Sequence, residues 1–196
     1  SLDISDIRKG LREANAEKER GDKHVRDLDF SAAEKRYQNA LSLYRITNYQ
    51  IGEANTLENL GDLYMRMARF SEAEAVYSQV LSIYQALEER LGQANILRSL
   101  GDLYMRMSRL SEAEATYHQA LPIYQALEER LGEANTLMSL GDLYLRQDRL
   151  AEAEAIYHQA LPIYRALVER LGEANTLRSL GDLYMRGSRL SEAEAV

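Results

Sequence analysis

The sequence has no cysteine, only two prolines among 196 residues and no long hydrophobic run. Without cysteine the chain can form neither a disulfide framework nor a thiolate metal site. No apolar stretch approaches the roughly 20 residues of a membrane-spanning helix, and the N-terminus lacks a basic region followed by an apolar one. We therefore expect a soluble protein, and the lack of cysteine is compatible with a cytoplasmic, reducing location.

Positive charge is also scarce. The chain has 24 Lys and Arg against 31 Asp and Glu, which gives a formal net charge of -7. Nucleic-acid and anionic-membrane binders present clustered Lys and Arg, so we expect neither partner. A composition of 45% hydrophobic and 28% charged residues is that of a globular protein with a continuous apolar core.

The dominant feature is an internal repeat. A Gly-Asp pair recurs at positions 21, 61, 101, 141 and 181, a constant step of 40 residues. Residues 91–130 and 131–170 agree at thirty of forty positions, which indicates recent duplication or a designed, consensus-like array. We predict a single array over residues 1–196: a divergent repeat 1 with an N-terminal extension (1–50), repeats 51–90, 91–130 and 131–170, and a truncated repeat 5 (171–196).

Each repeat predicts two helices. Apolar residues at Ala94, Leu97 and Leu100 have helical spacing, so helix A is expected over about 91–107. Ser111 followed by Glu114 predicts a capping box that starts helix B, which is expected to end near residue 129. The same box recurs as Ser31 with Glu34, Ser71 with Glu74 and Ser191 with Glu194, whereas Ala151 interrupts it in repeat 4. We expect that interruption to weaken the helix start by about 1 kcal/mol.

These residues resemble the tetratricopeptide repeat. Leu100, Gly101 and Tyr104 of helix A, with Ala113, Tyr117 and Ala120 of helix B, stand at that family's spacing. Leu97 replaces a frequent tryptophan of the family, and the unit has 40 residues instead of about 34. The longer unit is similar to repeats of GoLoco-containing polarity adaptors, kinesin light chains and signalling ATPases. The resemblance implies an all-α, right-handed superhelix, a tetratricopeptide solenoid, which binds proteins or peptides in its concave groove.

Four polar positions of helix A, exemplified by Asn95, Ser99, Asp102 and Arg106, share one face opposite the core. The resemblance places this face in the groove. Three positions form ladders: Asn15, Asn55, Asn95, Asn135 and Asn175; Asp22, Asp62, Asp102, Asp142 and Asp182; Arg26, Arg66, Arg106, Arg146 and Arg186. Asn amides can pair with the backbone of any extended peptide, so we expect the ladders to bind one.

An alternative is that Asn95 only links or starts helices and that Asp102 and Arg106 form an ordinary surface pair, which is compatible with peptide binding. One groove position varies, as Lys18, Glu58, Arg98, Met138 and Arg178. We expect selectivity to lie there. Arg98 and Arg178 leave one surplus positive charge in repeats 3 and 5, which predicts a partner peptide with acidic residues.

A methionine row stands beside this face, at Met65, Met105 and Met185. Methionine can line a groove for irregular apolar partners, or it can simply pack between successive helices. Leu145 at the equivalent place in repeat 4 favours plain packing.

His118 and His158 are in register, and each stands four residues before a proline, Pro122 or Pro162. Neighbouring helices lie about 8 to 10 Å apart and no third ligand is evident, so we expect no metal site. A proline inside a helix removes one hydrogen bond, which predicts curvature of helix B.

No catalytic constellation is present in the sequence. Glu112 and Glu114 form an acidic pair, but their place in the first helical turn is explained by capping and the helix dipole. No nucleophile with a base and no glycine-rich phosphate loop is visible, so we expect neither enzymatic activity nor a cofactor. We predict a protein- or peptide-binding scaffold. The alternative is a structural element that self-assembles end to end through its incomplete last repeat.

Overall fold

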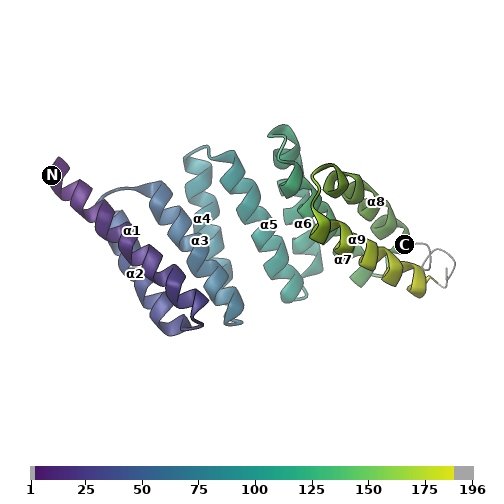
Figure 1. Ribbon diagram of the computed structural model, residues 1–196, viewed down its shortest axis with the longest axis horizontal. Helices are drawn as coiled ribbons and strands as arrows, with labels where there is room; N and C mark the ends of the chain where they lie inside the picture. The colour runs from purple at the N-terminus through teal and green to yellow at the C-terminus, as the bar shows by residue number, and fades with distance from the viewer. Residues whose placement is uncertain (1–2, 188–196) are drawn as a thin grey trace. The chain divides into compact units, whose positions relative to one another are not determined.

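The computed structural model describes residues 3–187, and the described chain consists of helices joined by short turns (Figure 1). The helices are α1 (Ile4–Arg26), α2 (Phe30–Ile46), α3 (Gln50–Arg66), α4 (Phe70–Ala86), α5 (Arg90–Arg106), α6 (Leu110–Ala126), α7 (Arg130–Arg146), α8 (Leu150–Ala166) and α9 (Arg170–Arg186). No strand occurs between residues 3 and 187, which confirms the all-α prediction. Contacts divide the chain into two compact units, residues 1–96 and 97–196, with the boundary inside α5.

The turns between helices share one backbone geometry. Each helix from α2 to α9 has 17 residues, and three residues precede the next one. The middle turn residue is left-handed, with φ of 52 to 60°, at every twentieth position from Leu28 to Val168. The next amide then closes the helix end, as where Arg149 N donates to the Tyr144 carbonyl over 2.9 Å. Helices of equal length joined by equal turns therefore produce the constant 40-residue step.

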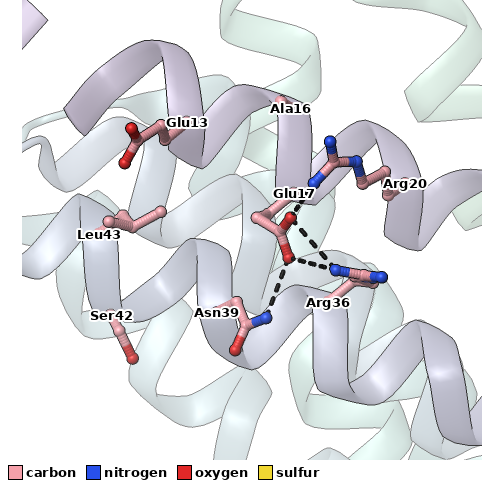
Figure 2. Close-up of a pocket in the computed structure, with 8 residues that line it drawn as sticks. All are labelled: Glu13, Ala16, Glu17, Arg20, Arg36, Asn39, Ser42 and Leu43. Atoms are coloured by element: carbon pink, nitrogen blue, oxygen red, sulfur yellow. Dashed lines mark hydrogen bonds and ion pairs between the residues drawn. The ribbon is translucent and has the colours of Figure 1, made fainter. Parts of the chain in front are cut away.

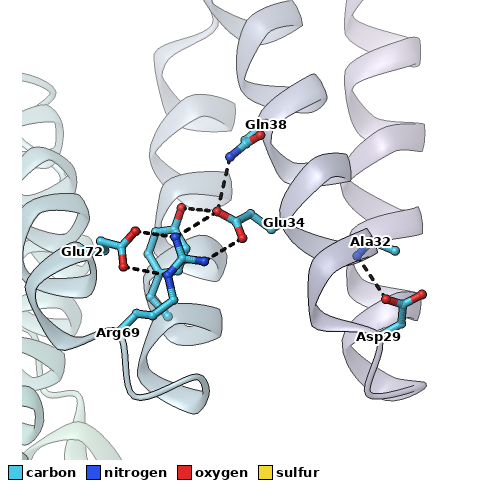
Figure 3. A network of polar contacts seen from close by, with 7 residues as sticks. Asp29, Ala32, Glu34, Gln38, Arg69 and Glu72 are labelled. Carbon is cyan, nitrogen blue, oxygen red and sulfur yellow. Dashed lines mark hydrogen bonds and ion pairs between the residues drawn. The ribbon is translucent and has the colours of Figure 1, made fainter.

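The predicted capping box is wrong, because helix B begins earlier than expected. Residue Arg109 is the N-cap of α6, so Ser111 already lies inside the helix and no side chain caps this helix start. In α2 the cap is Asp29, whose Oδ1 accepts a hydrogen bond from Ala32 N over 3.1 Å (Figure 3). Ala151 therefore removes no cap, and the expected weakening of repeat 4 does not arise. The box expected at residues 191 and 194 lies outside the described residues.

The repeated glutamate of that supposed box instead joins helix B to the next hairpin. Glu34 of α2 accepts hydrogen bonds from Arg69 over 2.7 Å and from Tyr64 Oη over 2.9 Å (Figure 3). The Arg69 guanidinium lies 4.3 Å from the centre of the Tyr64 ring and also pairs with Glu72 of α4. The second unit repeats this arrangement with Arg149, Glu114, Tyr144 and Glu152. A cation-π contact and two carboxylates thus fix each arginine between successive hairpins.

Glycine and tyrosine set the spacing between the helices. A Cβ on Gly141 of α7 would lie 2.4 Å from the Tyr157 ring of α8, and one on Gly101 would lie equally close to Tyr117. Gly101 therefore makes room for Tyr117. Tyr157 has no exposed surface, so the ring fills the space that the missing side chain leaves. The repeated glycine is therefore a packing residue of the hairpin.

Candidate peptide-binding surface

The asparagine row contacts buried tyrosines of helix B, the second helix of each hairpin. Tyr84 Oη donates to Asn55 Oδ1, and Tyr164 Oη donates to Asn135 Oδ1, both over 2.7 Å. Tyr44 makes the same contact with Asn15. Asn95 and Asn175 are half-buried at the equivalent positions. Because the oxygen faces the tyrosine, the Nδ2 donors of Asn55 and Asn135 make no hydrogen bond within residues 3–187.

Sequence analysis missed the role of these tyrosines. They recur at the 40-residue step as Tyr44, Tyr84, Tyr124 and Tyr164, a spacing that by itself indicates only a regular apolar face of helix B. Burial raises the pKa of Tyr164 to about 12, so its hydroxyl stays protonated and acts as a donor at neutral pH. The sequence signal that could have identified them is a constant separation: each tyrosine stands 29 residues after an asparagine of the row.

The aspartate row also binds tyrosines, one helical turn further along helix A. Tyr117 Oη donates to Asp102 Oδ1 over 2.7 Å, and Tyr157 Oη donates to Asp142 Oδ1 over 2.6 Å. Asp62 accepts from Tyr77 over 2.5 Å, and both Asp62 and Asp182 are exposed. Serines of the next helix A add contacts, because Ser139 donates to Asp102 and Ser179 to Asp142, each over 3.3 Å. Ser99 stands half-buried at the position of these serines. The aspartates therefore brace adjacent helices.

Asp142 gives this bracing a pH dependence. Burial raises the pKa of Asp142. The hydrogen bonds from Tyr157 and Ser179 and the charge of Arg178 lower it, but by less, so the pKa lies above its ordinary value. A carboxyl whose pKa is raised by folding stabilises the protein below its unfolded pKa of about 3.9, and that stability is lost as the pH rises through the folded pKa. We expect Asp142→Asn, which stays neutral and keeps an acceptor for Tyr157, to raise the urea midpoint at neutral pH.

The difference between Asp142→Asn and wild type should shrink as the pH falls towards 4, because the wild-type carboxyl then becomes neutral as well. Circular dichroism in urea, repeated from mildly acidic to neutral pH, measures this. Asp182→Asn, at the exposed equivalent position, is the matched control and should leave the midpoint unchanged. An equal or lower midpoint for Asp142→Asn at neutral pH would contradict the raised pKa.

All five arginines of the row are exposed, and two of them also bond to backbone carbonyls. Arg146 Nη1 donates to the Met105 carbonyl over 2.9 Å, and Arg186 Nη1 donates to the Leu145 carbonyl over 3.0 Å. These bonds satisfy carbonyls at the C-terminal end of the preceding helix A. Arg66 and Arg106 are exposed, and Asp102 pairs with Arg98 over 3.2 Å instead of with Arg106. The expected surface pair within α5 therefore has a different partner.

The variable position takes a different environment in each helix A. In the first unit Lys18 pairs with Asp22 over 3.4 Å, and Glu58 accepts from Tyr84 over 3.1 Å. In the second unit it is occupied by Arg98 of α5, Met138 of α7 and exposed Arg178 of α9. The Met138 sulfur lies 3.7 Å from Thr176 Oγ1, and its side chain packs against the core. The second unit thus has two cationic positions separated by an apolar one.

The histidines contact tyrosines of the next hairpin. His118 Nε2 lies 3.1 Å from Tyr144 Oη, and His158 Nε2 lies 3.3 Å from Tyr184 Oη. Residues 3–187 contain no cluster of three or more His, Asp or Glu side chains that would suit a metal ion. α6 continues through Pro122 to Ala126 and has the same length as proline-free α4; the predicted curvature stays a prediction.

The methionine row has different environments in different repeats. Met105 and Leu145 belong to, or pack against, one core cluster, whereas Met185 is 58% exposed. Plain packing therefore accounts for the row in the middle of the second unit. Within the described part of the chain, no helix combines the length and the apolar character that crossing a membrane requires.

Repeated hairpins of equal helices, with glycines that admit tyrosine rings, define a helical-repeat protein. The model of the tetratricopeptide repeat matches residues 12–86, 52–126, 92–166 and 132–196. The chain belongs to the tetratricopeptide repeat family, as the sequence motifs predicted, and its fold class is that of a tetratricopeptide solenoid. No curated protein sequence matches this one.

Solved structures of the same fold include BtubC from P. vanneervenii, with 21% identity and a TM-score of 0.83 over 97% of this chain and 86% of that one. The nearly identical repeats of a putative kinesin light chain from Podosopora anserina have 15% identity and a TM-score of 0.75, covering 92% of this chain and 90% of that one. A Rap protein complexed with competence and sporulation factor has 19% identity and a TM-score of 0.79. The match covers 95% of this chain but only 52% of the Rap protein. These likenesses concern the fold.

Proposed function

We propose that the chain is a non-catalytic scaffold that binds a protein segment in extended conformation along the polar face of helix A. The observation that carries this proposal is the orientation of the asparagines. Tyr84 and Tyr164 hold Asn55 and Asn135 by their oxygens, so the Nδ2 groups are left as donors for another chain. Peptide carbonyls are suitable acceptors whatever side chains the peptide has. The Rap protein of similar fold was solved with a bound factor, which agrees with this use of the fold.

The charges of the second unit favour an acidic partner. Asp102 accepts from Tyr117 and Asp142 from Tyr157, and Asp102 also pairs with Arg98, so exposed Arg106 supplies the surplus positive charge beside Arg98. Exposed Arg178 adds a second positive charge two helix A steps away. Neighbouring helices lie about 8 to 10 Å apart and an extended chain advances about 3.3 Å per residue. Acidic residues about five or six positions apart, with an apolar one between them for Met138, therefore fit this face.

Charge reversal tests the proposal. We expect Arg98→Glu with Arg178→Glu to weaken binding of a labelled peptide bearing two such glutamates by about tenfold or more. The same variant should gain affinity for a peptide with lysines in place of the glutamates. Fluorescence anisotropy measures both affinities.

The matched control is Arg130→Glu with Arg170→Glu, which makes the same change of charge at the first residues of α7 and α9. This control should bind the acidic peptide like wild type. Equal affinity of wild type and of the Arg98→Glu, Arg178→Glu variant would overturn the acidic preference. If Asn135→Ala with Asn175→Ala also left binding unchanged, the helix A face would not be the binding surface.

A further inference from the structure

The hairpin of α1 and α2 has a polar hollow on its surface. The hollow measures about 530 Å³ and is lined by residues that include Glu17, Arg20, Arg36 and Asn39 (Figure 2). A step of 120 residues along the repeat takes Glu17 to Leu137, Arg20 to Leu140 and Arg36 to Ile156. Leu137 and Leu140 are 2% and 0% exposed. Repeat 1 therefore replaces core positions of the later hairpins by charged residues.

In the later hairpin the same place receives the preceding helix B. Leu121 of α6 packs against the cluster formed by Leu137, Ala160 and Ile163 of α7 and α8. The equivalent place beside α1 and α2 is the polar hollow. A helix that covered this hollow as α6 covers the later hairpin would bring an apolar side chain against Glu17 and Arg36. That contact would remove water from charged groups without offering them a hydrogen bond.

Glu17 is already fully partnered within its own hairpin. Its carboxylate accepts from Asn39 Nδ2 over 3.0 Å and from Arg36 Nη1 over 3.1 Å, and Arg20 pairs with it as well (Figure 2). The hydrogen bond from Asn39, together with Arg36 and Arg20, keeps the pKa of Glu17 below its ordinary value in spite of burial. The residue is 9% exposed, whereas the Arg20 side chain is 59% exposed. The Glu17 carboxylate therefore has all its partners within the hairpin, while the two arginines remain partly exposed to water.

The backbone of α1 supports the same conclusion independently. Asn48, Glu88, Glu128 and Val168 are the left-handed turn residues between a helix B and the next helix A. The equivalent residue of repeat 1 is Arg8, which lies within α1. α1 starts at Ile4, where Asp3 Oδ1 accepts from Asp6 N over 2.9 Å. The usual three-residue connection from a preceding helix B is therefore replaced by six additional helical residues, 4–9.

From these two observations we infer that the hairpin of α1 and α2 is a capping repeat, whose outer face does not stack on another repeat. Although Leu43 and Ala16 also line the hollow, its charged residues oppose packing of the apolar helix of another repeat or of a second copy. Terminal repeats with a polar outer face keep repeat arrays from stacking on one another. This inference opposes end-to-end self-assembly at this face. It is independent of peptide binding along helix A.

The test restores the apolar residues of the later repeats. We expect Glu17→Leu, Arg20→Leu and Arg36→Ile together to associate at least about tenfold more strongly than wild type in sedimentation equilibrium, since the change exposes an apolar hollow. The double variant Glu17→Leu, Arg20→Leu should show the same effect more weakly. It serves as a second test if the triple variant loses helicity by circular dichroism.

Because the chain has no cysteine, a single one reports where copies meet. Ser42→Cys lines the hollow, and Ser78→Cys on α4 is an exposed control. With a short bis-maleimide, we expect Ser42→Cys to form no more linked dimer than Ser78→Cys in the wild-type background, and clearly more in the triple variant. Preferential linking through residue 42 in the wild-type background would overturn the inference. So would a folded triple variant and a folded double variant that associate no more than wild type.

Discussion

Gly141→Ala is expected to destabilise the protein by about 2 to 3 kcal/mol, although alanine is the better helix former. The added Cβ would lie 2.4 Å from the ring of Tyr157, which is fully buried and donates its hydroxyl to Asp142 over 2.6 Å. The ring can move away only by losing that hydrogen bond and its packing. Urea denaturation followed by circular dichroism measures the change in unfolding free energy.

Gly181→Ala is the matched control, because Gly181 occupies the same position 40 residues further on and no described atom lies within 4 Å of its Cβ position. Here alanine should stabilise the helix by about 0.5 to 1 kcal/mol through its higher helix propensity. One substitution at equivalent positions is thus expected to have opposite signs. If both variants were stabilised, the tyrosine ring would not be the reason for the glycine.

Leu137→Glu is expected to cost about 4 kcal/mol or more, enough to unfold the second unit if its stability is ordinary. Leu137 packs against Ile163 and Leu121, so glutamate would lose this burial and place a carboxylate among apolar side chains. Ile156 and Leu140 stand where repeat 1 has arginines. The carboxyl would have a raised pKa, and the loss should therefore diminish at acidic pH.

Glu17→Leu, the reverse exchange at the equivalent position, should change stability by about 1 kcal/mol or less. The arginines that it releases are partly exposed, and replacing a buried ion by an apolar side chain is often nearly neutral. Thermal and urea unfolding of both variants give the comparison. A tolerated Leu137→Glu would show that the apolar cluster of α6, α7 and α8 does not require an apolar residue at position 137.

The repeat made most of the fold predictable. The Gly-Asp step and the spacing of Leu97 and Leu100 located the helices and the family, because amphipathic periodicity is a local property. The capping box failed because Ser111 and Glu114 have the right separation, whereas the turn geometry begins α6 at Leu110. Sequence spacing does not reveal that Glu114 has a stronger partner, Arg149, in the next hairpin.

The positions of the candidate site residues were predictable from the sequence, but their hydrogen-bond partners were not. The ladders of Asn135 and Asp142 follow from helical winding alone. Only the structure brings Tyr164 and Tyr157 of another helix to these residues, which occupies their oxygens. The choice of groove residues as peptide ligands stays a prediction. The structure adds that the amide oxygens of Asn55 and Asn135 are bound by tyrosines, that Arg98 pairs with Asp102 and that Arg178 is exposed.

The sequence by itself determined the helices, their period and their membership of one family, since these depend on residues close together in the chain. Tertiary structure decided what each repeated residue does. Gly141 differs from Gly181 because only Gly141 has a described tyrosine ring against it. The difference between Glu17 and Leu137 lies in their neighbours, an ion network in one hairpin and a leucine of the preceding helix in the other. Burial and partnership depend on residues that are distant in sequence, and those contacts exist only in the folded chain.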